Sequence, residues 1–268
     1  MKRFNLFSLV FIIGLLGFSP EGELLSQPGN YHFKEIKQLE ATSVNNQGRT
    51  GTCWSFGTIS FLESELLRMN KGTYDLSEMF VIRQSYIDRA NLYVRFHGHL
   101  KFSPGAQGWD VINVMHDDGL VPQRVFPGNN DDEELPDHRE MDALLKGYVQ
   151  ALVEKENGNL SLSWREGFKG ILDAYLGEYP SQFTFKKSNY TPDSFVDDLG
   201  LDSKDYVPIT SFNNHPYYSK YVFESPDNWS MEMINNLPLD DLIRIMKHSI
   251  KEGYTIAWAA DVTDPGFN

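Results

Sequence analysis

The 268-residue chain contains one cysteine, Cys53. A single thiol forms no intrachain disulfide and cannot complete a cysteine-rich zinc site, so the fold must rest on a hydrophobic core. The composition provides for such a core, because 41% of the residues are hydrophobic. The length fits one large domain or two modest ones. The net charge is −13 and no dense run of Lys or Arg occurs, which argues against a nucleic-acid partner.

The residues around Cys53 are typical of a nucleophile. The apolar spacing that follows it predicts a helix from about residue 53 to 69, so the thiol lies at a helix N-terminus, where the dipole favours a thiolate. Gly48 and Gly51 leave the preceding backbone open to a substrate, and Gln47 can donate to a developing oxyanion. The alternative is a structural cysteine that packs as a small hydrophobe, but the local pattern favours acyl-transfer chemistry. The string reads Gln47-Gly48-Arg49-Thr50-Gly51-Thr52-Cys53-Trp54-Ser55-Phe56.

This string resembles the nucleophile segment of papain-like cysteine peptidases. Thr50 stands where secreted members commonly have a disulfide-forming cysteine, and a long insertion follows the first helices, as in the bleomycin hydrolase and aminopeptidase C branch. Further stretches resemble that branch: Asp75–Glu78, Ser103–Asp110, Gly119–Pro122, Leu237–Asp240 and the segment 256–261.

The resemblance implies an α+β fold with two papain-like subdomains, of which the helical one is complete and the β-rich one truncated. It implies that Cys53 attacks a peptide carbonyl while Gln47 stabilises the oxyanion, without a cofactor or a metal. The resemblance implies an aminopeptidase that acts on peptides, and hexamers in the family imply a homo-oligomer. Its substrate-binding residues would be Gly51, Trp54, Gly105 and Ala106, where Ala106 replaces the second glycine of the family's pair.

The chain divides into four predicted regions. Residues 1–26 read as a signal peptide, with Lys2 and Arg3 before an apolar run at 6–18, which predicts export to the periplasm or cell envelope without a stable membrane anchor after cleavage. A helical subdomain with the nucleophile would span 27–125, and a helical and loop insertion 126–236. The β-rich subdomain would begin at 237–268.

Hydrophobic periodicity predicts six helices. Residues 28–46 read as extended, 126–138 as an acidic loop and 254–261 as a strand, whereas the proline-rich stretch 177–236 carries no usable period. The expected helices are 53–69, 76–90 with Ser77 as its cap, 110–118, 139–156, 163–176 and 239–251.

A thiol peptidase also needs a general base, and no histidine stands in the strand context of the family's base. We therefore expect an amino-terminal fragment, with the catalytic His and Asn beyond residue 268. An alternative is that His215 or His248 serves from an unusual position. Two other functions stay open, a papain-like module that binds peptides without cleaving them and a thiol-dependent amidase or acyltransferase. The seven histidines are His32, His97, His99, His116, His138, His215 and His248.

Overall fold

The computed structural model describes residues 34–128, 135–155 and 159–260. Two compact units divide the chain, residues 1–36 with 261–268 and residues 37–260, and every element below belongs to the second. The predicted signal peptide lies outside the described residues. None of the helices among the described residues has the length and hydropathy needed to cross a membrane.

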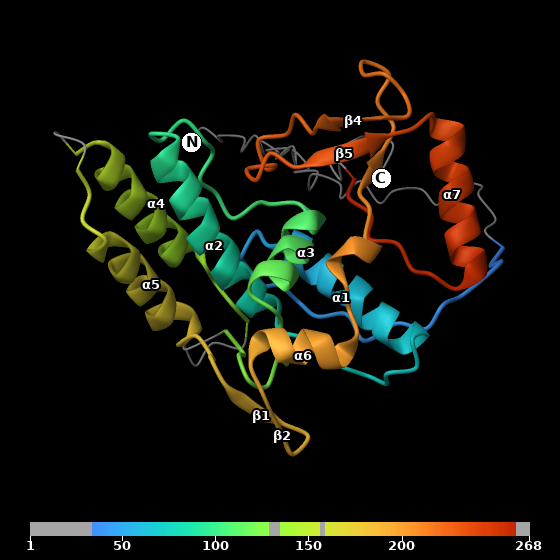
Figure 1. The fold of residues 1–268 in the computed structure, drawn as a ribbon, viewed down its shortest axis with the longest axis horizontal. Helices are drawn as coiled ribbons and strands as arrows, with labels where there is room; N and C mark the ends of the chain where they lie inside the picture. Colours follow the sequence, from blue (N-terminus) through green and yellow to red (C-terminus); the bar gives the residue numbers. More distant parts are fainter. Residues whose placement is uncertain (1–33, 129–134, 156–158, 261–268) are drawn as a thin grey trace, which may run out of the picture. The chain divides into compact units, whose positions relative to one another are not determined.

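Three helices form the centre of this unit, α1 (Cys53–Arg68), α2 (Glu78–Arg95) and α3 (Gly108–Asp117), and each packs against the other two. Helices α4 (Arg139–Val153) and α5 (Ser163–Leu176) pack against each other and against α2 (Figure 1). The short helix α6 (Pro192–Leu199) packs on α3, and the 3₁₀ turn η1 (Ser203–Asp205) follows it.

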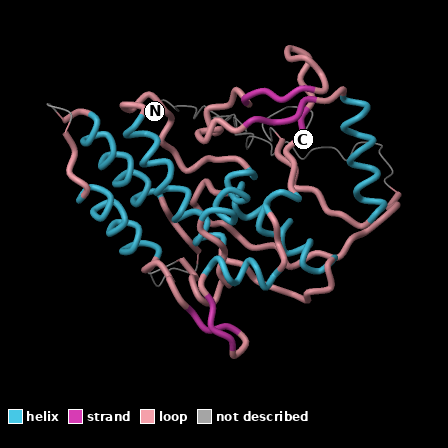
Figure 2. Tube along the Cα trace, viewed as in Figure 1, coloured by secondary structure: helices cyan, strands magenta, loops and turns pink. Residues whose placement is uncertain are grey.

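Two small sheets complete the fold, as Figure 2 shows. Strands β1 (Phe183–Phe185) and β2 (Ser188–Tyr190) form an antiparallel hairpin. Strands β3 (Ile209–Thr210), β4 (Ser219–Val222) and β5 (Met233–Asn236) form a sheet in the order β3-β5-β4, with β3 parallel and β4 antiparallel to β5. Helix α7 (Leu239–Glu252) follows β5.

The core forms because each central helix presents apolar residues three or four positions apart. On α1, Ile59, Leu62 and Leu66 are each at most 1% exposed. They share one cluster with Phe80 of α2 and Phe168 of α5. Burying each such side chain contributes about 1.5–3 kcal/mol of transfer free energy. This cluster fixes the start of α1, and therefore the position of Cys53.

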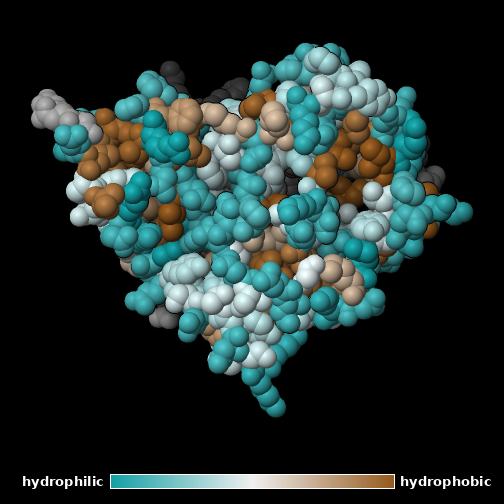
Figure 3. Space-filling view, in the orientation of Figure 1, coloured by the Kyte–Doolittle hydropathy of each residue, from teal (hydrophilic) through white to brown (hydrophobic). Residues whose placement is uncertain are grey.

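Helix α7 differs from the others, because none of its residues is fully buried although its pattern is strongly amphipathic. Leu239, Ile243 and Ile245 are exposed. Figure 3 shows apolar surface beside this helix. The helix ends at Gly253, which caps it in the left-handed region.

The six predicted helices are confirmed with shifts of a few residues at their ends. Ser77 caps α2, because its Oγ accepts a hydrogen bond from the Phe80 amide at 3.0 Å. The strand expected at 254–261 is wrong over its described part, since residues 254–260 are irregular. A strand needs a neighbour to pair with, and no described segment pairs with this one; Trp258 there is 73% exposed. The division at residues 125 and 236 stays a prediction.

Candidate active site

Cys53 is the first residue of α1, and its side chain is exposed. The helix begins there because the Thr52 carbonyl accepts from the Ser55 amide at 2.9 Å, which closes the first turn. The amides of the first turn therefore surround the thiol, and the positive end of the helix dipole lies beneath it. This confirms the predicted setting of Cys53 at a helix N-terminus.

The residues 47–52, here called the nucleophile loop, are held by their own side chains. The Gln47 Oε1 accepts from the Thr52 amide at 3.1 Å, so the carbonyl end of the side chain is bonded to the loop and its NH₂ group is the end that can donate elsewhere. The Thr50 hydroxyl donates to the Gln47 carbonyl at 3.0 Å and lies 2.5 Å from the Thr52 hydroxyl. Both threonines are buried, so hydroxyl hydrogen bonds hold the loop.

A second segment, residues 136–138, crosses the back of the nucleophile loop and is called the strap below. The Arg49 amide donates to the Pro136 carbonyl at 2.8 Å, and the His138 amide donates to the Arg49 carbonyl at 3.2 Å. Gly48 has φ +64°, and a Cβ on it would lie 2.3 Å from the Pro136 oxygen. The close approach of the strap therefore requires glycine at position 48.

The predicted substrate-binding residues lie together beside Cys53. The Trp54 indole N–H donates to the Pro104 carbonyl at 3.0 Å, and a Cβ on Gly51 would lie 3.0 Å from the Pro104 ring. Trp54 is only 9% exposed, so its contact is with the segment that contains Gly105 rather than with open solvent. Ala106 packs partly buried against the core.

A cavity of about 440 Å³ opens at the thiol, with Cys53 and Gln47 both in its wall. The segment that forms one side of it is fixed by buried carboxylates, since Asn45 donates to Glu78 Oε1 at 3.0 Å and Thr42 to Glu63 Oε2 at 2.5 Å. Burial raises the pKa of both Glu63 and Glu78. The cavity is lined by Val44, Asn45, Asn46, Gln47, Cys53 and Phe56.

Motif spacing did not predict that Glu78, Pro136 and Asp227 contact this site. The Glu78 carbonyl accepts from the Ser55 hydroxyl at 3.1 Å, so Glu78 contacts both the Asn45 side and the α1 side of the cavity. Pro136 supports Gly48, and Asp227 lies against Gly105. They are far from Cys53 in sequence, and a motif search has no means of finding such contacts.

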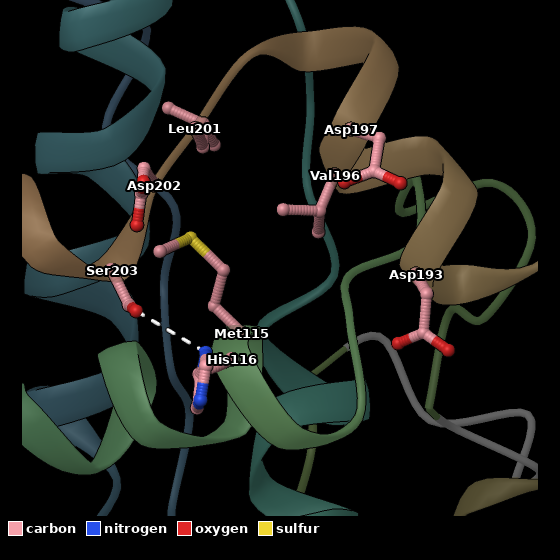
Figure 4. A pocket seen from close by; sticks show the side chains of 8 residues that line it. All are labelled: Met115, His116, Asp193, Val196, Asp197, Leu201, Asp202 and Ser203. Carbon is pink, nitrogen blue, oxygen red and sulfur yellow. Dashed lines mark hydrogen bonds between the residues drawn. The ribbon is translucent and has the colours of Figure 1, made fainter.

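A second cavity, of about 260 Å³, lies among α3, α6 and η1 (Figure 4). The His116 ring lies 3.3 Å from the Ser203 hydroxyl there, and the carboxylates of Asp193, Asp197 and Asp202 are exposed at its edge. Among the described ranges, no group of three His, Cys, Asp or Glu side chains has the arrangement of a metal site.

None of the histidines in the described part of the chain lines the cavity at Cys53. His97 and His99 are exposed, and His32 lies outside the described residues. His215 stacks on Tyr221 with ring centroids 3.8 Å apart and lies 3.3 Å from Glu224. His248 lies 4.0 Å from Glu252 on α7.

His138 is the buried exception, at 4% exposure. Neither ring nitrogen has a hydrogen-bonding partner in the described part of the chain. Burial lowers the pKa of His138 to about 4, against an opposing effect of Asp137, so the ring is neutral at pH 7. Its amide bonds to the back of the nucleophile loop, so its role is at the strap rather than in the cavity.

Comparison with known proteins agrees with this arrangement. Residues 28–87, which include the nucleophile loop and α1, match the model of the papain family of cysteine proteases. By this match the chain is similar to the papain family of cysteine proteases. Over most of its length the chain is similar to bleomycin hydrolase and to bacterial aminopeptidases, as the sequence motifs predict.

Aminopeptidase G of Lactobacillus delbrueckii subsp. lactis is 25% identical over 84% of this chain and 60% of its own length. Bleomycin hydrolase of Mus musculus is 21% identical over 88% of this chain and 62% of its own. The crystal structure of PepW from Lactobacillus rhamnosis has the same α+β fold, with a TM-score of 0.62, 20% identity, and coverage of 81% of this chain and 58% of PepW. These two curated relatives are longer than this chain, which spans about 60% of their length.

Proposed function

We propose that the full protein is an exported cysteine peptidase of the aminopeptidase type, which removes amino-terminal residues through an acyl-enzyme on Cys53. The observation that carries the proposal is that the exposed Cys53 and the side chain of Gln47 line one cavity at the start of α1. The aminopeptidases among the relatives support the substrate class, and the sequence of residues 1–26 supports export.

The reaction would begin with attack of the Cys53 thiolate on the carbonyl carbon of the first peptide bond. A C–S bond forms and the carbonyl π electrons move to oxygen, where the Gln47 NH₂ and the Cys53 amide donate hydrogen bonds. Collapse of this intermediate breaks the C–N bond, and the leaving amine takes a proton from the general acid. Water then hydrolyses the thioester and restores the thiol.

Other residues of the site would position the substrate. Gly105 and Ala106 are proposed to align its backbone, while Trp54 holds that segment through the Pro104 carbonyl. We place the general base outside the described residues, because none of the histidines within them lines the cavity. The proposal for the full protein also includes a residue that orients the catalytic histidine, and a homo-oligomer.

The test uses the full-length protein with aminoacyl-coumarin amides and a thiol-directed epoxide. We expect turnover of the amides and one epoxide per chain, located on Cys53 by peptide mass spectrometry. Cys53→Ala should abolish both, whereas Thr50→Ser, which keeps the hydroxyl of the nucleophile loop, should retain both. Turnover that survives Cys53→Ala contradicts the proposal, and so does an unlabelled Cys53.

Among the described residues, no histidine lines the cavity at Cys53, and this observation also favours a second function. A papain-like module without a base would hold a peptide in the cavity without cleaving it. Titration calorimetry of the full-length protein with short peptides distinguishes the two, because binding without any product after long incubation supports the module.

A further inference from the structure

The loop between β4 and β5, residues 223–232, lies against the segment that contains Gly105. A Cβ placed on Gly105 would lie 2.9 Å from the Oδ1 of Asp227 and 3.1 Å from its Oδ2. The Asp227 carboxylate is therefore in van der Waals contact with the glycine backbone. Lys101 binds the same carboxylate, with Nζ 2.7 Å from Oδ1.

Buried side chains fix this loop. Asn228 donates to the Phe223 and Glu232 carbonyls at 2.9 and 3.0 Å and accepts from the Glu232 amide at 3.0 Å. The neighbouring Trp229 is 7% exposed and lies under the Arg89 guanidinium, 5.1 Å from the ring centroid. Because the residues after Asp227 are held in this way, its carboxylate has a defined position beside Gly105.

This carboxylate is open to solvent and lies beside a segment that contacts Trp54, the residue after the nucleophile. Gly105 follows Pro104, whose carbonyl accepts from the Trp54 indole, and Trp54 follows Cys53. The side chains of Asp227 and Lys101 are 36% and 48% exposed. A peptide aligned along Gly105 would therefore pass the carboxylate.

We propose that Asp227 is a specificity-determining residue that attracts a cationic group of the substrate to the Gly105 side of the site. Lys101 holds Oδ1, and the carboxylate accepts the incoming cation through its remaining lone pairs. The cation is either the α-ammonium of the peptide or a basic side chain, two sources of one chemistry. The inference rests on the proposed function, because it assigns a role to a residue beside the proposed substrate path.

The experiment measures kcat/KM of the full-length protein for matched substrates. One pair compares a free α-amine with its N-acetylated form, and the other compares Arg with Leu as the amino-terminal residue. Asp227→Asn should lower the preference for the charged member of one pair by about threefold to fivefold, the range expected for a half-exposed ion pair. The pair whose preference falls identifies the source of the cation.

Two further variants complete the test. Lys101→Met removes the competing cation and should raise the same preference, and it decides the question by itself if Asp227→Asn does not fold. Asp197→Asn, an exposed carboxylate on α6 beside the second cavity, should leave both preferences unchanged. Unchanged preferences in both Asp227→Asn and Lys101→Met overturn the inference. Turnover of the free-amine substrates in the same experiment keeps the proposed function. If the wild type cleaves none of the substrates, the proposed function fails and the inference fails with it.

Discussion

At the scale of single residues, the site depends on how Gln47 is oriented. Its Oε1 accepts from the Thr52 amide, which directs the NH₂ group rather than the carbonyl toward any oxyanion at Cys53. Motif spacing alone predicted the pairing of Gln47 with Cys53, because both lie in one short loop. It could not predict Asp227 or Glu78, which reach the site only through the folded chain.

Gln47→Ala should lower kcat of the full-length protein by roughly 10²- to 10³-fold, since one oxyanion donor is lost, with a much smaller change in KM. Steady-state kinetics on an aminoacyl amide measure this. Val44→Ala, in the same cavity wall but 95% exposed, is the matched control and should retain most of kcat. Equal losses in both variants would mean that Gln47 supports the cavity wall and does not act on the oxyanion.

At the scale of elements, the strap and the nucleophile loop form one unit with α1. The six predicted helices are long enough to show their apolar period, whereas α6, with eight residues in a proline-rich stretch, was not predicted. The strands could not be predicted either, since they have two to four residues and depend on partners elsewhere in the chain. The strap was part of an expected acidic loop, and only the structure shows its end, Pro136–His138, bonded to Arg49.

Gly48→Ala should destabilise the protein by about 2 kcal/mol or more. The residue has φ +64°, which costs an L-residue about 1–2 kcal/mol, and its Cβ would overlap the Pro136 oxygen. Gly147→Ala in α4 is the control, because a Cβ there meets nothing within 4 Å and should stabilise the helix by about 0.5–1 kcal/mol. Urea unfolding of both variants measures the difference. Wild-type stability in Gly48→Ala would show that the strap does not constrain the loop.

At the scale of the whole molecule, buried titratable groups give opposite pH dependences. Burial raises the pKa of Asp110 to about 6, so the folded state binds a proton more tightly than the unfolded state. Its contribution to stability is present at acid pH and is lost as the pH rises through 6. His138 has the reverse sign. Its folded pKa of about 4 lies below the ordinary 6.5, so its contribution is present above 6.5 and is lost as the pH falls toward 4.

Single substitutions should therefore change the pH profile of stability in opposite directions. Between pH 8 and pH 5, His138→Gln should gain about 2 kcal/mol relative to the wild type, because the wild type must keep an imidazole neutral. Asp110→Asn should lose about 1 kcal/mol relative to the wild type over the same interval, because it forgoes the proton uptake. Urea midpoints at several pH values measure both, and parallel profiles for wild type and variants would contradict the assigned pKa shifts.

The threonine pair at positions 50 and 52 has a consequence for handling the protein. Hydroxyl hydrogen bonds do not respond to reducing agents, so the nucleophile loop keeps its shape under strong reductant. The same conditions hold Cys53 as a thiol, and no second cysteine in these 268 residues competes with it for a reagent. A thiol titration under native conditions therefore counts Cys53 alone within this part of the protein, and its rate reports directly on the chemistry of that one sulfur.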